Sequence, residues 1–463
     1  MAQVLRSFHE HEVLVLIVCP LVLLLILRFA TSTTTTRRAD KLLHRLPSPP
    51  YKLPLIGHLH LVGSLPHISL RSLAEKHGPD AMLLRLGAVP SLVVSSARAA
   101  MAVLRTHDHA FASRVQSAMT GILFYGSTDM AFSPYGDHWR QIRKIVATHL
   151  LSFKKVGSYR LAREKEVQHA MARIREAAAR SAAVDLSKLL SSFTTDIVSH
   201  VVSGKSFRGG GRNELFRELV ETSSMLIGGF NLEDYFPKLA RLDVTLKLKS
   251  ISNEFQMNSK NYKLSDMFIG GTDTSFIVLD CAMAELIQNP EVMTKLQAEV
   301  RSVAEGKEMV TKEDLSGMIY LKGVIKETRR LHSPVPLFVP HLSTADCDVE
   351  GYTIPSGTRD PAYWESAEKF MPVRFMENVG STMIPDYMGN NFHYLPFGTG
   401  RRVCPGMNFG MATVEIMLAN LMFHFNWDLP AGTVKINMTE SFGVTVGRKE
   451  NLILVPALAQ KQV

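Results

Sequence analysis

The sequence predicts a mainly α-helical fold with small β-sheets, preceded by a single N-terminal transmembrane helix. Three features support this fold class. Long stretches in the middle of the chain repeat apolar residues at helical spacing, whereas short runs near both ends of the body are typical of strands. The chain also opens with an apolar segment that contains no charged residue.

The apolar segment runs from Val13 to Leu27, and two further apolar residues follow Arg28, whose long side chain can reach the membrane surface. A spanning helix needs about 20 apolar residues. A cleaved signal peptide is the alternative, but it would begin with positive charge. Here most of the nearby positive charge follows the run. We therefore expect residues 1–30 to form an uncleaved anchor with the body of the protein in the cytosol.

Polar residues and prolines separate this anchor from the body of the protein. The stretch TSTTTTRR is followed by a proline-rich segment that ends at Gly63. Proline cannot continue a helix and favours stiff, extended backbone. We expect residues 31–63 to form a polar linker and hinge, and residues 64–463 to form one large domain.

The composition limits the functions that the chain can have. Of its 463 residues, 46% are hydrophobic, and the formal net charge is +9. That charge indicates either a solubilising surface or a basic face for an acidic protein or an anionic membrane. No basic run is interleaved with aromatic residues, so nucleic acid is not an expected partner. The four cysteines form no CxxC pair, which argues against a disulfide framework or a cysteine-rich zinc site.

Periodicity predicts the order of the elements. Strand-like runs cover 81–86 and 91–95, and two more occur near the C-terminus, SFGVTVG and NLILVPA. Helical patterns cover 135–150, 160–180, 186–202, 214–226, 275–305 and 312–331.

One cysteine, Cys404, lies in an elaborate local setting, HYLPFGTGRRVCPGMNFG. Pro405 suits the first position of a helix, and the run after Met407 has helical character, so Cys404 is predicted at a helix N-terminus, where an anion is stabilised. The glycines allow backbone to approach a flat ligand, and the arginines suit its carboxylates. An inert cysteine in a tight turn is the alternative for such a cysteine considered alone.

The complete pattern resembles the haem-binding signature of the cytochrome P-450 family, at Phe397, Gly400, Arg402, Cys404 and Gly406. The resemblance covers almost the whole chain after the linker and implies the cytochrome P-450 fold, with residues 64–463 as a haem-thiolate catalytic domain. It also implies that the Cys404 thiolate is the axial ligand of haem b iron, where it favours O–O cleavage.

A second motif, GGTDTS at 270–275, opens an apolar helical run. A helix start capped by Thr or Asp is one interpretation, because glycine disfavours a helix interior. The resemblance implies instead a helix that passes over the haem. Gly270 and Gly271 would leave room for O2, and Asp273 and Thr274 would organise proton delivery.

Two further groups follow from the resemblance. Glu327 and Arg330 share a helix face and would form a structural triad with Arg374, although a surface ion pair is the alternative. Trp139, Arg143, Arg402 and His341 would donate to the haem propionates, His341 in place of a more usual arginine.

The implied activity is monooxygenation of a small hydrophobic substrate. Electrons would come from NADPH through NADPH-cytochrome P-450 reductase, because no GxGxxG motif follows a strand. Arg140 and Lys144 would add to a basic face for this reductase. The anchor and the proline segment look like the plant microsomal type, which places the protein in the endoplasmic reticulum membrane with its catalytic domain facing the cytosol.

The sequence also suggests a class of substrate. GHLHLVGSLPH, LRTHDHAFASR and GGFNLEDYFPKLARLD look like grass enzymes that hydroxylate indole-derived defence compounds. The expected substrate-contacting stretches are mostly apolar and suit a small aromatic compound or a terpenoid equally well. They are 117–127, 225–230, 268–271, 335–339 and 442–446.

The chain departs from the family pattern in two places. It is shortened near 256–260, where the family carries a further helix, and at 359–360, where the family carries a sheet strand. Losing a strand leaves backbone groups of its neighbours unpaired. An inactive or haem-free copy is therefore one alternative function. A haem-thiolate isomerase or dehydratase is another, which Asp273 and Thr274 argue against, and a cysteine hydrolase lacks a paired general base.

Overall fold

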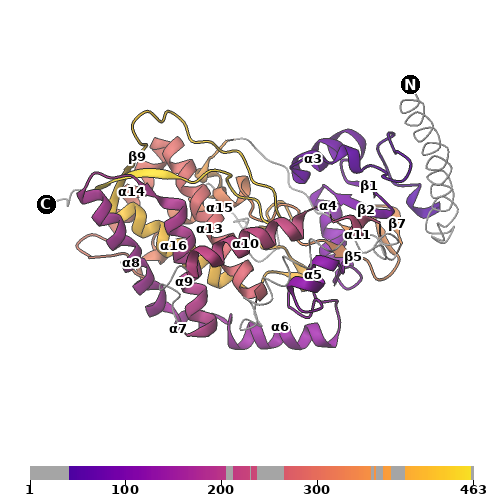
Figure 1. Cartoon of the computed structure of the whole chain (residues 1–463), viewed down its shortest axis with the longest axis horizontal. Coiled ribbons are helices and arrows are strands. Elements are labelled where there is room, and N and C mark those ends of the chain that lie inside the picture. Colours follow the sequence, from indigo (N-terminus) through magenta and orange to yellow (C-terminus); the bar gives the residue numbers. More distant parts are fainter. Residues whose placement is uncertain are drawn as a thin grey trace, which may run out of the picture.

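The structure is a computed structural model, and it describes residues 41–204, 212–229, 231–236, 265–355, 359–360, 369–376 and 392–459. The predicted anchor, the first part of the linker and the predicted shortening near 256–260 lie outside these residues. Within the described part, helices predominate and the strands form small sheets, which confirms the predicted class (Figure 1).

The helical body is built around α13 (Ser265–Gln288), which packs against α9 (Leu186–Ser203), α15 (Ile319–Leu331) and α16 (Met407–His424). Both α13 and α16 are apolar around most of their circumference, as helices buried on all sides must be. Among the described residues, Met267–Gln288 is the one helix long and apolar enough to cross a membrane, and 67% of its apolar stretch is buried inside the protein. It is the core helix of this body.

The predicted helix over 275–305 is wrong in its extent. The structure has two helices here, α13 and α14 (Pro290–Val303), which meet at Asn289. Pro290 has no backbone N–H and its ring disfavours helical backbone in the preceding residue, so the helix ends before it and a new one begins on it. The GGTDTS motif is not a helix start either, because α13 begins earlier, at Ser265.

Other predicted helices are confirmed within a few residues. They correspond to α6 (Asp137–His149), α8 (Arg160–Ala179), α9 and α10 (Arg212–Gly228). The predicted helix over 312–331 is confirmed only toward its C-terminal end, because α15 begins at Ile319 and a short 3-10 helix, Asp314–Ser316, precedes it. The remaining described helices are α3 (Pro66–His77), α4 (Ala97–Met101), α5 (Ala118–Leu123), α7 (Phe153–Ser158) and α11 (Leu232–Tyr235).

The largest sheet has the strand order β1-β2-β8-β5-β3 and lies with α3 at one end of the molecule, away from α8 and α14 (Figure 1). Its strands are β1 (Ala81–Leu86), β2 (Val89–Val94), β3 (Ser113–Arg114), β5 (His341–Leu342) and β8 (Arg359–Asp360). The predicted shortening at 359–360 stays a prediction, but the sheet is not interrupted there. Arg359 pairs with Ser91 on one side and Leu342 on the other, so a two-residue strand keeps the sheet continuous.

Two smaller sheets complete the described strands. One has the order β4-β10-β9 and the other joins β6 to β7. Their strands are β4 (Val184–Asp185), β6 (Cys347–Val349), β7 (Tyr352–Ile354), β9 (Phe425–Asp428) and β10 (Ile453–Leu458). The predicted strand NLILVPA corresponds to β10, whereas SFGVTVG forms no strand and instead packs as a loop against α10 and α13.

Candidate active site

A cavity of about 300 Å³ lies between α13, the start of α16 and the Cys404 loop. Its lining is mainly apolar, but Cys404, Thr274 and several arginines face it. The structure thus brings together two motifs that lie far apart in the sequence, the cysteine loop and the GGTDTS motif.

Cys404 lies immediately before α16, whose N-cap is Gly406. Its backbone N–H donates to the carbonyl oxygen of Phe397 at 2.9 Å, which closes the loop. The Cys404 side chain is exposed, but into the cavity, since protein surrounds the site. That desolvation raises the pKa of the thiol, while the Gly406 N–H and the charges of Arg329 and Arg143 lower it. A thiolate here therefore depends on these three groups or on a bound cation.

The Cys404 loop docks closely against the N-terminal part of the body. Gly400 has a φ of +67°, and a Cβ at this position would lie 2.2 Å from the carbonyl oxygen of Leu104. Only glycine permits both the conformation and the approach. This glycine fixes where the loop lies, as its place in the signature predicted.

Two half-buried arginines, Arg143 and Arg402, lie beside the loop and contact the same indole ring. The guanidinium carbon of Arg143 lies 5.5 Å and that of Arg402 lies 4.2 Å from the Trp139 ring centroid. Burial and the neighbouring Arg143 lower the pKa of Arg402 to about 10. Within the described residues these two arginines donate to carbonyl oxygens and form no ion pair. Two close cations without a carboxylate partner favour an anionic ligand.

Trp139 is buried next to the arginine pair. It does not line the cavity, and its indole N–H donates to the carbonyl oxygen of Met130 at 3.0 Å. Its role in the structure is to carry the two arginines on its ring faces. Its donation to a propionate remains a prediction.

His341 and Arg114 also belong to the polar lining of the cavity. His341 Nδ1 donates to the carbonyl oxygen of Phe111 at 2.7 Å, which leaves Nε2 as the other polar atom of the ring. Burial and the charges of Arg114 and Arg402 hold the His341 pKa well below its usual value, so the ring is neutral. Arg114 was missed by the sequence analysis, because a single arginine in a short strand carries no motif.

The GGTDTS motif, which lies within α13, supplies another wall of the cavity. Gly270, Gly271 and Thr274 line the cavity, and a Cβ at Gly270 would meet nothing within 4 Å. The Thr274 hydroxyl donates to the carbonyl oxygen of Gly270 at 2.7 Å. This bond turns a hydroxyl lone pair, rather than the proton, toward other groups.

Asp273 does not line the cavity and instead accepts a hydrogen bond from the Thr445 hydroxyl. Thr445 also lies 2.5 Å from the Ser224 hydroxyl, so a chain of polar groups leads away from α13. Burial raises the Asp273 pKa to about 6, with a smaller contribution from Glu221. Asp273 therefore exchanges its proton near neutral pH, which suits a proton relay.

The residues of this cavity fit haem. Gly270 and Gly398 both line it, and a Cβ at either would meet nothing within 4 Å, which leaves space for a flat macrocycle. The arginine pair suits the carboxylates of such a ligand. The described residues contain no group of three or more metal-binding side chains, so a metal here would rely on the ligand's own nitrogens together with the one thiol.

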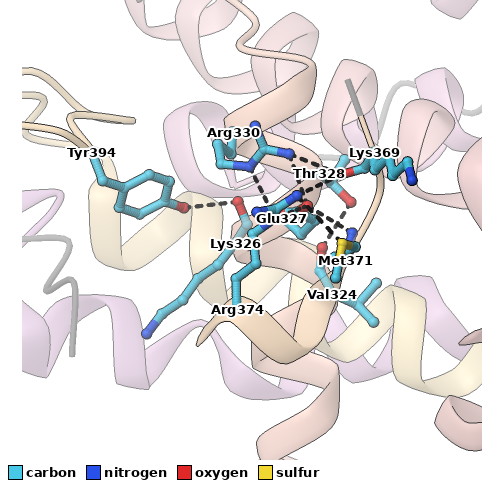
Figure 2. Close-up of polar contacts among 9 residues, drawn as sticks. All are labelled: Val324, Lys326, Glu327, Thr328, Arg330, Lys369, Met371, Arg374 and Tyr394. Carbon is cyan, nitrogen blue, oxygen red and sulfur yellow. Dashed lines mark hydrogen bonds and ion pairs between the residues drawn. The ribbon is translucent and has the colours of Figure 1, made fainter. Parts of the chain in front are cut away.

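Glu327, Arg330 and Arg374 form an ion-pair triad around a buried carboxylate (Figure 2). Glu327 is fully buried and lies 2.7 Å from Arg330 and 3.3 Å from Arg374. It also accepts a hydrogen bond from the Met371 backbone N–H at 2.7 Å, which fastens this segment to α15. The predicted triad is therefore present, with Arg374 as its most exposed member.

The same helix holds the segment that leads into the cysteine loop. The Tyr394 hydroxyl donates to the backbone carbonyl oxygen of Lys326 at 3.1 Å (Figure 2). Thus α15 fixes both the triad segment and the approach to Cys404.

The chain matches known proteins over most of its length. A family model described as cytochrome P450 matches residues 47–253 and 237–455. Indole-2-monooxygenase from Zea mays is 48% identical over 91% of this chain and 89% of that protein. Two more Zea mays proteins are 46% identical, 3-hydroxyindolin-2-one monooxygenase over 90% of this chain and 89% of its own length, and indolin-2-one monooxygenase over 92% of each.

The first alignment spans 478 positions, more than the 463 residues of the chain, so that relative contains residues that this chain lacks. The residues that match the family model nevertheless include the cysteine loop, the GGTDTS motif and the triad. The chain belongs to the cytochrome P450 family of monooxygenases.

Proposed function

We propose that the protein inserts one oxygen atom from O2 into a small, indole-derived hydrophobic substrate, using haem b and electrons from NADPH. The main support for this proposal is that Cys404 and Thr274 line the same cavity, together with the half-buried arginines Arg143 and Arg402. The names of the maize relatives favour an indole-derived substrate over a terpenoid.

Each part of the site would have a separate task. Bound haem supplies the oxygen chemistry, and a thiolate ligand favours O–O cleavage. Cys404 would ligate the iron, while Arg143 and Arg402 would hold the propionates. His341 would donate to a propionate from Nε2 only in its protonated form, because its Nδ1–H is already bonded to the Phe111 carbonyl oxygen. Gly270 leaves space above the flat ligand. The Thr274 hydroxyl accepts and passes a proton, and Asp273, with a pKa of about 6, resupplies it.

A second cavity of about 220 Å³ adjoins the first and supports a small apolar substrate. Phe338 and Val339 line both cavities and so form the wall between them. Phe338 has a φ of +54°, unusual for a residue with a side chain, in a turn closed by its N–H and the Val335 carbonyl oxygen. This ring therefore limits substrate size.

Phe338→Ala would join the two cavities, and we expect it to raise kcat/KM for a bulky substituted indole relative to indole. Leu337→Ala is the matched control, because Leu337 lines the second cavity but not the first. The comparison is the ratio of the two kcat/KM values in each variant. Equal ratios in both variants and the wild type would show that Phe338 is not the size limit.

Electrons would arrive from NADPH-cytochrome P-450 reductase. On α6, Arg140 and Lys144 are exposed while Trp139 is buried, so this helix presents positive charge outward close to the cofactor site. An acidic flavoprotein would be attracted to such a face. The reductase as partner and the basic face as its binding surface are both part of this proposal.

The apolar segment at residues 1–30 would anchor the protein in the endoplasmic reticulum membrane, with the catalytic domain facing the cytosol. The chain expressed in yeast should sediment with microsomes and resist carbonate extraction, whereas residues 31–463 should be released. Equal release of both forms would contradict the anchor.

Product analysis tests the reaction itself. Microsomes containing the protein and a reductase are incubated with indole or indolin-2-one, NADPH and ¹⁸O₂. The account predicts a product that is heavier by one ¹⁸O atom and that requires NADPH. A product formed without NADPH would favour an isomerase or a dehydratase, and the shortened chain makes an inactive copy the remaining alternative.

A further inference from the structure

A third arginine, Arg329, reaches the cysteine loop from α15. It lies between the triad residues Glu327 and Arg330 in the sequence. Unlike them, it lines the Cys404 cavity. Arg329 is only 5% exposed. Its guanidinium carbon lies 4.3 Å from the centroid of the Phe397 ring, the geometry of a close cation–π contact.

Phe397 connects this arginine directly to the cysteine. The carbonyl oxygen of Phe397 accepts the hydrogen bond from the Cys404 N–H at 2.9 Å. On the other flank, Arg143 donates to the carbonyl oxygen of Val403 at 2.6 Å. Two guanidinium groups from different helices, the buried one of Arg329 and the half-buried one of Arg143, therefore contact the same turn, one through Phe397 and one through Val403.

The charge of Arg329 acts on the sulfur as well as on the loop. Arginine remains protonated when buried, so its charge persists at every working pH. Together with Arg143 it lowers the pKa of the Cys404 thiol against the effect of burial. Glu415 on α16 lies near Arg329 and Lys322. Burial raises the pKa of its carboxyl, whereas these two cations lower it.

We propose that Arg329 is a positioning residue that fixes the Phe397 ring and places a permanent positive charge beside the Cys404 sulfur. The inference rests on the proposed haem-thiolate function. A cation beside the sulfur stabilises electron density there and so weakens donation to the iron. It also favours the reduced over the oxidised metal, because the oxidised site carries one more positive charge.

The holoprotein tests this through its reduction potential. Arg329→Leu and Arg329→Gln remove the charge, whereas Arg329→Lys keeps it. Both neutral variants should shift the haem potential to more negative values, and the lysine variant should retain most of the wild-type value. Lys326→Leu is the matched control, because Lys326 stands on the same helix but contacts the Phe375 ring at 5.8 Å.

A second measurement separates failure of the inference from failure of the proposed function. Without haem, the rate of Cys404 alkylation by iodoacetamide at fixed pH reports the thiolate fraction, with Cys404→Ser as the blank. Arg329→Leu or Arg329→Gln should slow alkylation roughly three- to tenfold. Wild-type protein without a haem spectrum would overturn the proposed function, yet alkylation would still test Arg329. Unchanged potential and unchanged alkylation in folded neutral variants would overturn the inference.

Discussion

Individual residues of the cysteine loop differ in what surrounds them even where their backbone is the same. Gly398 and Gly400 both have a φ of +67°. A Cβ at Gly398 would meet nothing within 4 Å, whereas one at Gly400 would collide with the Leu104 carbonyl oxygen. The pair therefore separates the cost of a left-handed conformation from the cost of lost docking.

Gly398→Ala should lower the free energy of unfolding by about 1–2 kcal/mol, the cost of a side chain in left-handed backbone. Gly400→Ala should cost clearly more, since the loop must move away from Leu104. Thermal unfolding of the two variants measures the difference. Equal behaviour of the two variants would mean that contact with Leu104 does not position the loop.

Asp273 gives a pH-dependent prediction. Its folded pKa of about 6 exceeds the usual 3.8, so the folded protein binds this proton more tightly and loses stability as pH rises from about 4 to 6. Asp273→Asn removes that loss. Relative to the wild type, the variant should gain stability across this window, by up to about 3 kcal/mol, and remain constant above it.

Thermal unfolding of both proteins between pH 4.5 and 7.5 checks this prediction. A difference independent of pH would show that Asp273 is not protonated in the folded state near pH 5. The same substitution should slow NADPH-dependent product formation at pH 7, because the relay loses its proton donor.

At this scale the sequence predicted what carries a motif. Cys404, Thr274 and Arg402 lie on the cavity, as their spacing within two recognisable patterns indicated. Arg114 and Arg329 also face it, but isolated arginines are usually exposed and nothing in their spacing marks them. Their role follows only from which neighbours the fold gives them. Trp139 differs from these arginines. Its motif marked it as a site residue, but the sequence did not predict that its indole N–H donates to the Met130 carbonyl oxygen.

Among the elements, α15 has the most connections to the site. Its residue Glu327 is fully buried with two arginines and a backbone N–H (Figure 2). Removing one member of a buried pair leaves charge without compensation and costs about 3–5 kcal/mol. This explains why the triad can be structural while lying outside the cavity.

Glu327→Gln should therefore lower the free energy of unfolding by about 3–5 kcal/mol and reduce haem retention. The control is Glu75→Gln, which breaks an exposed i, i+4 pair with Arg71 and should cost below about 1 kcal/mol. Chemical denaturation of both variants gives the comparison. A loss at Glu327 as small as that at Glu75 would contradict a supporting role for the triad.

The element boundaries show where periodicity suffices. Helices with one apolar face are predicted best. Both ends of α6 and the C-terminal end of α15 lie within a few residues of their predicted positions. The division of 275–305 was missed, although Pro290 was the signal, because both halves are strongly apolar or amphipathic and continue the same pattern. The strand β8 was missed because two residues are too few to show any period, and its pairing partners are distant in the sequence.

For the whole molecule, the question is whether a shortened chain still forms the site. The family match falls into two parts that overlap at 237–253, close to the predicted shortening near 256–260. At the other place, β8 still joins β2 to β5, so the sheet that carries His341 remains continuous. The described body thus contains both walls of the cavity, the arginine pair and the triad.

The central claim is that Cys404 ligates haem iron in this chain. The measurement is the difference spectrum of the dithionite-reduced protein in microsomes with and without carbon monoxide. The account predicts a Soret shift of the kind that thiolate-ligated haem gives with carbon monoxide, and its loss in Cys404→Ser at equal protein level. Absence of any haem absorbance in the wild type, or an unchanged maximum in Cys404→Ser, would contradict it.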